Sequence, residues 1–255
     1  MAHLKSEAIV LRRFDYSETS QVAWVYTRDF GKERLIAKGA KRLGKNALGA
    51  LDPLTHIHVV FIDKEHAGLR TLTEWDLLSS FDGLRQNLDR VYLASYAVEL
   101  VNELTEVGEP NPKVFDLLVR ILTRLCVPDD HHKLVFAFEF GLLRAVGFAP
   151  EVGRCAHCGI ALTQDRRTYF SAGEGCMLCF DCRQSDDAAV AVSYAALGAM
   201  AGLARGGREY LDRLRLGRET GAEIRRLLDI HLQRVVGKEL KVRRYLNLQF
   251  EGAQR

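Results

Sequence analysis

Five of the six cysteines of this chain lie close together, between Cys155 and Cys182. They include two Cys-x2-Cys pairs, Cys155 with Cys158 and Cys179 with Cys182. Each pair places two thiolates on one tight turn, and Gly159, directly after the first pair, lets the backbone bend. Two such pairs complete a tetrahedral shell around Zn²⁺. The sequence therefore predicts one structural zinc ion held by these four cysteines.

The fifth cysteine of the cluster, Cys176, leaves a second assignment open, because Cys176-x2-Cys179 is also a pair. If that pair were used, Cys182 would be the spare residue. We prefer Cys179 and Cys182, since Glu174-Gly175 has the composition of a turn that precedes the last strand of a small zinc ribbon. Cys176 is then expected to be a neighbouring buried thiol. We expect His157, inside the first pair, to point outward.

The metal site is predicted to be structural rather than catalytic. A catalytic zinc keeps one coordination position open and has a general base nearby, such as the His-x-Glu motif of zinc deaminases. The sequence has no His-x-Glu, and four cysteines fill the shell. A near match to a phosphate-binding loop, Gly39-x4-Gly44-Lys45, has Asn46 where a hydroxyl would hold Mg²⁺. We therefore expect a protein that is not an enzyme.

The first 80 residues have the pattern of short β-strands. Runs rich in Val, Ile, Tyr and Trp are separated by turn signals, for example at 15–17 and 29–31. Five strands in so short a segment fit a small closed or partly closed barrel, which leaves few free sheet edges. We expect strands at 8–14, 21–27, 32–38, 54–62 and 69–75, in a domain that spans residues 1–80.

The apolar spacing becomes helical after residue 81. One helix ends before Gly108, a second begins at the cap Asn111-Pro112, and a third runs from Pro128 to Gly147. Helical spacing resumes at Ser193 and continues to about Tyr245. It is interrupted at Gly206-Gly207 and at Gly217. The predicted fold class is thus α+β, with an N-terminal barrel and an α-helical domain over 81–255 that carries the four-cysteine zinc finger as an insertion at about 150–186.

No segment has the pattern of a membrane span or a secretion signal. The longest uncharged stretch, residues 188–204, is rich in Ala and Gly. It is shorter than the about 20 residues that cross a bilayer, so a packed helix is expected there. We therefore expect a cytoplasmic protein without membrane contact, and in the cytosol clustered cysteines bind metal rather than form disulfides.

The net charge of +3 hides two basic regions. Residues 31–45 hold six basic residues and one acid, and they follow strands that carry aromatic side chains. Cations beside aromatic rings are typical of proteins that bind single-stranded nucleic acid. The alternative is a solvated loop that keeps the barrel rim soluble. The candidate nucleic-acid-binding residues are Arg13, Arg34, Lys38, Lys41, Arg42, Lys45, Trp24 and Tyr26, with Phe14 and Tyr16 as further rings that could stack.

The second basic region lies near the C-terminus and contains one acid, Glu239. Two basic regions that are far apart in sequence would allow an extended binding surface. The residues of this candidate second patch are Arg234, Lys238, Lys241, Arg243 and Arg244.

Several motifs, in one order along nearly the whole chain, resemble those of the bacterial RecO family of recombination mediators. The N-terminal ones are Glu7-Ala8-Ile9-Val10-Leu11, Tyr16-Ser17-Glu18-Thr19-Ser20, Thr27-x3-Gly31-Lys32 and Ala37-Lys38-Gly39-Ala40-Lys41-Arg42. The later ones are Tyr169-Phe170-Ser171 followed by Leu178-Cys179-x2-Cys182, and Leu240-Lys241-Val242-Arg243-Arg244. The family has a glycine where this chain has Cys176, which favours Cys176 as the spare cysteine.

This resemblance implies an oligonucleotide/oligosaccharide-binding (OB) barrel, a helical domain with a zinc insertion, and a non-enzymatic role in recombinational DNA repair. Proteins of this family bind single- and double-stranded DNA, anneal complementary strands, and engage the C-terminal tail of the single-strand binding protein. With RecR they help load RecA. The resemblance thus implies DNA, RecR and the single-strand binding protein as partners, RecA as an indirect partner, and a nucleoid-associated location.

The alternative function is a zinc-ribbon module that binds nucleic acid or protein in transcription or translation. A competition between single-stranded DNA and RNA for the barrel would distinguish the two functions, because the alternative predicts a preference for RNA or for a protein.

Overall fold

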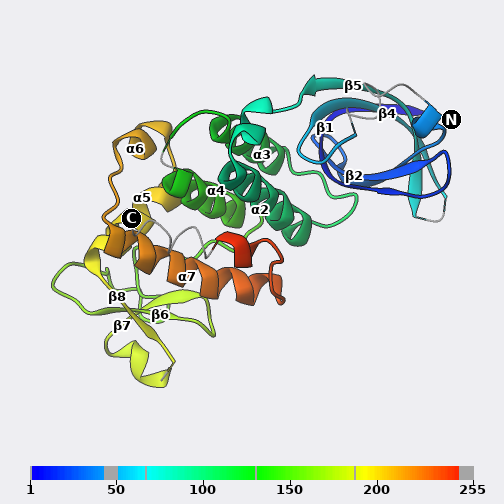
Figure 1. Ribbon diagram of the computed structural model, residues 1–255. Coiled ribbons are helices and arrows are strands. Elements are labelled where there is room, and N and C mark those ends of the chain that lie inside the picture. The colour runs from blue at the N-terminus through cyan, green and yellow to red at the C-terminus, as the bar shows by residue number, and fades with distance from the viewer. Residues whose placement is uncertain (1, 43–50, 67, 130, 187, 247–255) are drawn as a thin grey trace. The chain divides into compact units, whose positions relative to one another are not determined.

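The computed structural model describes residues 2–42, 51–66, 68–129, 131–186 and 188–246 (Figure 1). Its N-terminal part is a closed five-stranded barrel with the strand order β1-β2-β3-β5-β4. Pairing of β1 with β4 closes the barrel, and β3 with β5 is the parallel pair. The bounds are β1 His3–Asp15, β2 Gln21–Thr27, β3 Gly31–Ala37, β4 His56–His66 and β5 Leu69–Ser79. The five predicted strands and the predicted barrel are confirmed.

The barrel forms because inward-facing positions alternate along its strands. On β2, for example, Ala23 and Val25 are fully buried in the barrel core, while Trp24 between them lies on the outer face. A register shift between Val10 and Arg12 interrupts the β1–β2 ladder. Such a bulge increases the local twist that a small barrel needs to close. The buried core cluster contains Ala8, Val10, Ala23, Val25, Leu35, Ala37, Ala40, Leu51, Ile57, Val59, Phe61 and Leu72.

Two helices follow the barrel and pack against it. After the short 3-10 helix η2 (Asp82–Gln86) come α2 (Leu88–Leu104) and α3 (Pro112–Leu125). The Asn87 side chain accepts a hydrogen bond from the amide of Asp89 at 2.7 Å and caps α2. Asn111 caps α3, with Pro112 inside its first turn. The cap predicted at Asn111-Pro112 is confirmed.

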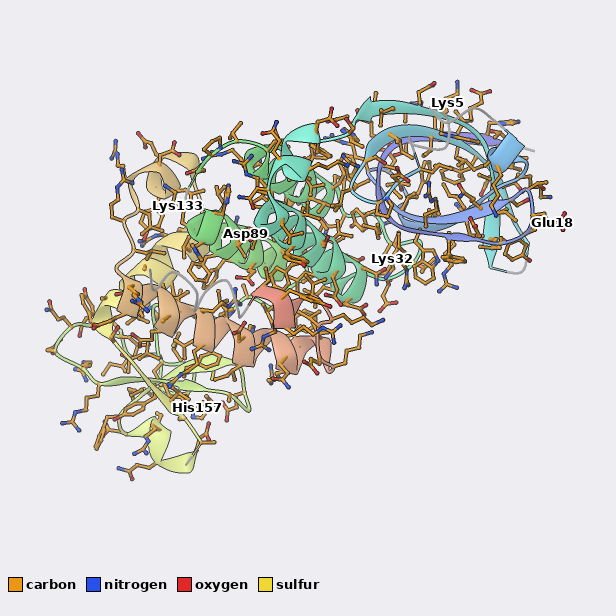
Figure 2. All side chains as sticks on the ribbon, in the orientation of Figure 1. Lys5, Glu18, Lys32, Asp89, Lys133 and His157 are labelled. Carbon is orange, nitrogen blue, oxygen red and sulfur yellow. The ribbon has the colours of Figure 1, made fainter. Side chains whose placement is uncertain are left out.

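Lys32 joins the barrel to α2. Its Nζ donates hydrogen bonds to the carbonyl oxygens of Asn102, at 2.6 Å, and Thr105, at 2.5 Å (Figure 2). Those carbonyls lie at the C-terminal end of α2, where a helix has unpaired acceptors and a negative dipole end. Burial lowers the pKa of Lys32, and nearby Glu106 opposes that change. Lys32, part of the basic 31–45 segment, is therefore a structural residue.

The backbone beside Lys32 also requires glycine. Gly31 has a φ of +70°, and a Cβ there would lie 2.1 Å from the carbonyl oxygen of Glu109. The chain between α2 and α3 thus passes directly against the start of β3, and only glycine permits this contact.

The remaining elements form a second body. They are α4 (His131–Ala145), β6 (Thr168–Ser171), β7 (Cys176–Cys179), η3 (Cys182–Ser185), β8 (Val190–Val192), α5 (Tyr194–Arg205), α6 (Arg208–Arg213) and α7 (Arg218–Val236). The Ser193 side chain caps α5, and α5, α6 and α7 are separated at Gly206-Gly207 and Gly217, as predicted. Helix α7 ends at Val236, because Gly237 adopts a left-handed cap, and helical residues resume at 243–246, close to the end expected near Tyr245.

By their internal contacts, the described residues form two compact units, one within 2–129 and 242–246 and the other within 131–241. We call these the barrel unit and the zinc unit. The barrel strands end at Ser79, next to the domain boundary expected at residue 80, but α2 and α3 belong to the barrel unit. Within the described part of the chain, no helix is long and apolar enough to span a bilayer. The uncharged stretch at 188–204 forms β8 and most of α5.

Candidate metal centre and nucleic-acid interface

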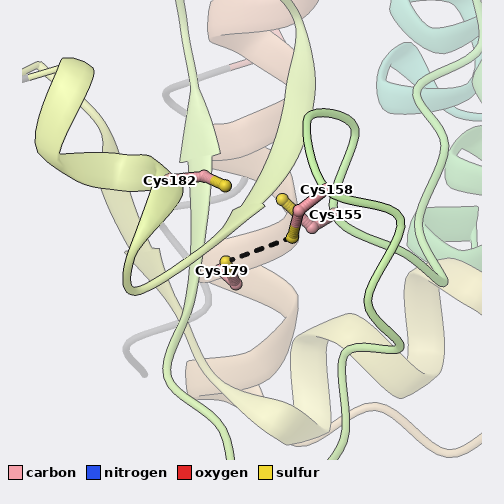
Figure 3. Close-up of side chains that lie close together, drawn as sticks. All are labelled: Cys155, Cys158, Cys179 and Cys182. Carbon is pink, nitrogen blue, oxygen red and sulfur yellow. Dashed lines mark hydrogen bonds between the residues drawn. The ribbon is translucent and has the colours of Figure 1, made fainter.

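Four cysteine sulfurs converge in the zinc unit (Figure 3). The Sγ atoms of Cys155, Cys158, Cys179 and Cys182 all lie within 4.8 Å of one another, and none of them forms a disulfide. Two of them, Cys158 and Cys179, have their sulfurs 3.7 Å apart. Around Zn²⁺, with Zn–S bonds of about 2.3 Å, the edge of a tetrahedron measures about 3.8 Å. The four thiols thus fit a tetrahedral zinc site without rearrangement of the backbone.

The first Cys-x2-Cys pair sits on a tight hairpin. The Cys155 amide donates to the carbonyl of Ile160 at 2.9 Å, and the Gly159 amide donates to the carbonyl of Cys155 at 2.9 Å. Gly159 has a φ of +73°, as its predicted role in the turn requires. This turn aims both thiols of the pair toward β7.

The surroundings of Cys155 favour a thiolate. Burial alone would raise the pKa of its thiol, but backbone amides at Cys158, Cys179 and His157 donate toward the sulfur and lower the pKa to about 6. Amides that point at a sulfur stabilise the negative charge that a metal ligand must carry. The chemistry of this donor set therefore fits a metal ion that prefers thiolates, such as Zn²⁺.

The strand β7 explains why Cys176 stands outside this group. Cys176 and Cys179 are the first and last residues of β7, so extended backbone separates them by about 10 Å. The predicted turn at Glu174-Gly175 is present, with the Gly175 amide donating to the Ser171 carbonyl at 2.8 Å. Cys176 is partly exposed, which corrects the expectation of a buried thiol. His157 is exposed, as expected.

The segment around the cysteines is a small sheet with the order β7-β6-β8, which we call, with the Cys155–Cys158 turn, the zinc module. It reaches beyond the predicted 150–186, because β8 pairs with β6. One face of the module packs on α7, where Phe170 meets the His231 ring at 6.0 Å. Arg234 on the same helix donates to the carbonyl of Gly173 at 2.6 Å. The four cysteines thus lie beside a small sheet whose buried apolar residues include Phe170, Met177 and Leu178.

The candidate nucleic-acid interface lies on the outer face of the barrel. In the strand register, Trp24 on β2 pairs with Arg12 on β1 and with Arg34 on β3. Both guanidinium groups lie over the Trp24 ring, with Cζ 3.8 Å from the centroid for Arg12 and 4.3 Å for Arg34. Arg34 Nε is buried and has no hydrogen-bond partner among the described residues. Two positive planes on an aromatic platform are suited to phosphates and bases.

Beside this trio the same outer face is covered. Tyr26 has no exposed surface, and its hydroxyl donates to the carbonyl of Asn111 at 3.4 Å, at the start of α3. Tyr26 therefore cannot stack on a base in the folded chain, which corrects its selection as a stacking residue. Helices α2 and α3 cover Tyr26 and Lys32, whereas Arg12 is exposed and Trp24 and Arg34 are half-buried.

One end of the barrel carries the exposed rings. Phe14 at the end of β1 is 46% exposed, and Tyr16 in the following turn is 61% exposed, so either can stack on a base. Lys41 donates to the Asp15 carboxylate and to the Ser17 carbonyl, both at 2.9 Å, and so pins this turn. The Asp15 pKa is lowered, mainly by its hydrogen bond from Lys41. Lys38 is exposed beside them.

Of the remaining candidate cations, Arg13 is paired, and Arg42 and Lys45 lie partly or wholly outside the described residues. Arg13 forms an ion pair with Asp52 at 2.6 Å. Arg42 is the last residue of the 3-10 helix η1 (Ala40–Arg42), and its side chain lies outside the described residues. Lys45 lies outside the described residues altogether, as do Gly44 and Asn46 of the near-match loop.

The second basic region is divided between the two units. Arg234, Lys238 and Lys241 belong to the zinc unit, and Arg243 and Arg244 belong to the barrel unit. Arg234 attaches α7 to the zinc module through its hydrogen bond to the Gly173 carbonyl. The Cζ atom of Arg244 lies 4.9 Å from the centroid of the Tyr245 ring. Each unit thus carries part of the predicted patch, which stays a prediction.

Arg12 is the residue that the sequence reasoning missed. The signal was present, because Arg12 and Phe14 are two residues apart and therefore share one face of a strand. The cross-strand register that places Arg12 opposite Trp24 depends on the bulge between Val10 and Arg12. The sequence around residue 11 contains no pattern that predicts this bulge.

Comparison with known proteins matches both parts of the chain to one family. A family model described as Recombination protein O N terminal matches residues 1–81, and one described as Recombination protein O C terminal matches residues 85–244. The chain is 32% identical to the DNA repair protein RecO of Anaeromyxobacter dehalogenans over 247 residues, which cover 97% of each chain.

Two further relatives carry the same name. The DNA repair protein RecO of Bacillus pumilus is 30% identical over 249 residues, which cover 96% of this chain and 93% of the relative. That of Geobacter metallireducens is 37% identical over 188 residues, which cover 71% of this chain and 73% of the relative.

Proposed function

Because the chain belongs to the RecO family of DNA repair proteins, we propose that it is a DNA-binding recombination mediator. It anneals complementary strands and, with RecR, helps load RecA onto DNA coated with single-strand binding protein. The family that the sequence motifs predicted is confirmed, and with it a role in DNA repair. The finer activities and the partners DNA, RecR, RecA and the tail of the single-strand binding protein are part of the proposal.

The observation that carries the proposal is the trio of Arg12, Trp24 and Arg34 on the barrel, in which both guanidinium groups lie over the Trp24 ring and Arg12 is exposed. The faces of β2 and β3 and the adjoining loops are the surface with which OB barrels bind oligonucleotides. Annealing requires two polyanions to approach each other, so a protein that screens phosphates with planar cations lowers the barrier without a catalytic group. In our proposal the chain therefore acts as a binding protein rather than as an enzyme.

We further propose that the four-cysteine centre holds one structural Zn²⁺ ion. Cys155, Cys158, Cys179 and Cys182 would hold it, and it would supply the cross-link that a small sheet lacks. All four positions around the ion are taken by protein sulfur, so the ion would have no role in chemistry on a ligand.

The direct test of the proposed function is strand annealing. Complementary oligonucleotides coated with single-strand binding protein are expected to anneal several times faster when this protein is added, as followed by a fluorescence signal from paired labels. An RNA pair of the same sequence serves as the comparison. An unchanged annealing rate for DNA would contradict the mediator function, and a preference for RNA would favour the alternative zinc-ribbon function.

A second test addresses the interface. The double variant Arg12→Gln and Arg34→Gln is expected to bind single-stranded DNA more weakly, and the slope of log K against log salt is expected to fall by about 1.4, since each lost phosphate contact removes about 0.7. The difference from the unmodified protein should shrink as salt rises. Fluorescence anisotropy at several salt concentrations measures both quantities.

The matched control is Lys5→Gln with Lys113→Gln. It removes the same net charge from the barrel unit. Lys5, however, is an exposed residue that pairs with Val60 on β4, and Lys113 is exposed on α3. An equal loss of slope in this control would mean that binding follows net charge rather than the trio around Trp24.

A further inference from the structure

A second group of metal-ligating side chains lies beside the four-cysteine centre. His157 Nε2 is 2.7 Å from a carboxylate oxygen of Glu174, and Cys176 Sγ is 3.4 Å from the same oxygen. One ligand atom from each of the three residues lies within 4.8 Å of the others. Among the described residues, this group and the four cysteines are the clusters with ligand atoms this close.

The backbone fixes all three residues on two rigid turns of the zinc module. His157 belongs to the first cysteine turn, which is tied to β7 by a hydrogen bond from the Ala156 amide to the Met177 carbonyl at 2.9 Å. Glu174 belongs to the β6–β7 turn, where its amide donates to the Ser171 hydroxyl at 3.2 Å. Ligands on fixed turns give up little conformational freedom when they bind an ion.

The β6–β7 turn is itself held in place from outside. Gly175 has a φ of +71°, and a Cβ there would lie 2.8 Å from both His231 and Arg234 on α7. The turn therefore lies tightly against this helix, and its conformation does not depend on an ion being bound to Glu174.

This group is distinct from the four-cysteine centre. Cys176 and Cys179 lie at opposite ends of β7, and His157 lies between two cysteine ligands in sequence but its ring contacts the β6–β7 turn (Figure 2). All three side chains are at least partly exposed, whereas Cys155 and Cys179 are buried. A metal ion bound by this group would therefore exchange readily with ions in solution.

We propose that His157, Glu174 and Cys176 form a second, exchangeable site for a divalent transition ion of the Zn²⁺ class. Imidazole nitrogen, carboxylate oxygen and thiolate sulfur are the three ligand types that Zn²⁺ takes in proteins, and three protein ligands leave one position for water. The carboxylate and the thiolate neutralise the two charges of the ion. As the metal–sulfur bond forms, the Cys176 thiol releases its proton to solvent. The proton that His157 Nε2 shares with Glu174 passes through solvent to Nδ1, and bonds from Nε2 and from the carboxylate to the metal replace the hydrogen bond.

Binding at this site is weaker than at the four-cysteine centre. Burial, together with Glu174, raises the pKa of Cys176 to about 12, so a metal must displace a firmly held proton. The site also supplies one thiolate rather than four. An ion held there would therefore be removed by dialysis under conditions that leave the four-cysteine centre filled.

The test titrates Co²⁺ into the full zinc-containing chain. The unmodified protein is expected to bind one Co²⁺ per chain with a single-thiolate charge-transfer band in the near ultraviolet, while its one zinc ion remains bound. Cys176→Ser is expected to abolish the band, and Glu174→Gln to weaken Co²⁺ binding by more than about tenfold. Cys126→Ser and Glu151→Gln, at a cysteine of the barrel unit and an exposed glutamate of the zinc unit, are expected to change neither quantity.

Three results would overturn the proposal. The unmodified protein could bind no Co²⁺ beyond its zinc, the band could persist in Cys176→Ser, or Cys176→Ser could lose the tightly bound zinc. Zinc content, measured on every variant before the titration, separates the last result from the others and also shows that each variant is folded around its four-cysteine centre.

Discussion

Replacing Cys179 with serine is expected to empty the four-cysteine centre and to unfold the zinc module. A structural Zn²⁺ ion contributes about 10–16 kcal/mol of apparent binding free energy in zinc-finger peptides, which equals or exceeds the about 5–15 kcal/mol that stabilises a whole domain. Cys179 is buried at the end of β7, and its backbone amide points toward Cys155. No nearby side chain of the described residues replaces it, because Cys176 lies at the other end of the strand.

Metal analysis and protease digestion measure this effect. The zinc content should fall from about one ion per chain to near zero, and cleavage should appear between β6 and β8 at protease concentrations that leave the unmodified protein intact. Prolonged chelation of the unmodified protein should give the same cleavage pattern. Cys176→Ser is the matched control, and it should keep the tightly bound ion. If Cys176→Ser lost that ion and Cys182→Ser kept it, the ligand assignment would be wrong.

Replacing Arg225 with leucine is expected to destabilise the zinc unit by about 3–5 kcal/mol. Arg225 NH1 donates to both carboxylate oxygens of Glu139, at 2.8 and 3.0 Å, and Glu139 has no exposed surface. A second ion pair joins Arg225 to Asp229, one turn along α7, at 2.8 Å. The substitution removes the guanidinium but leaves the buried Glu139 charge, and this loss costs far more than that of a surface ion pair.

Urea unfolding of the zinc-loaded protein measures this change. Arg226→Leu is the matched control, because Arg226 is the next residue on α7 but is exposed, so its effect should stay within about 0.5 kcal/mol. Adding Glu139→Leu to Arg225→Leu should recover most of the lost stability, since two apolar residues then replace the pair. A double variant no more stable than Arg225→Leu alone would show that the cost arises from lost packing around Arg225 rather than from the buried Glu139 charge.

The clustering of the four cysteines was predictable because its information is local in sequence. A Cys-x2-Cys pair closes a turn by itself, so the ligands could be named before any tertiary contact was known. The same is true of the cap at Asn111 and of the helix breaks at Gly206-Gly207 and Gly217. The choice of Cys182 over Cys176 depended on residues 176–179 forming an extended strand. The turn composition at Glu174-Gly175 was enough to favour Cys182.

The interface was less predictable because it depends on what covers each strand face. Tyr26 and Trp24 are two residues apart on one strand. Tyr26 is nevertheless fully buried, with its hydroxyl against the start of α3, whereas Trp24 is half-buried. From the sequence, Lys32 was one more cation of a basic segment. In the structure its ammonium group donates to carbonyls at the end of α2. Contacts between segments that are far apart in sequence do not appear as a periodic pattern of residue types.

The contacts of Gly31 and Lys32 with the chain beyond residue 100 bear on how this protein can be divided for experiments. A fragment that stops near residue 81, where the N-terminal family match ends, would lose the carbonyls that hold the Lys32 ammonium and the segment that covers Tyr26. The surface around Tyr26, which is buried in the full chain, would then be exposed to solvent. A fragment carried through Asp129 retains both helices but lacks the part of the barrel unit that begins at Val242, whose amide donates to Glu99 on α2.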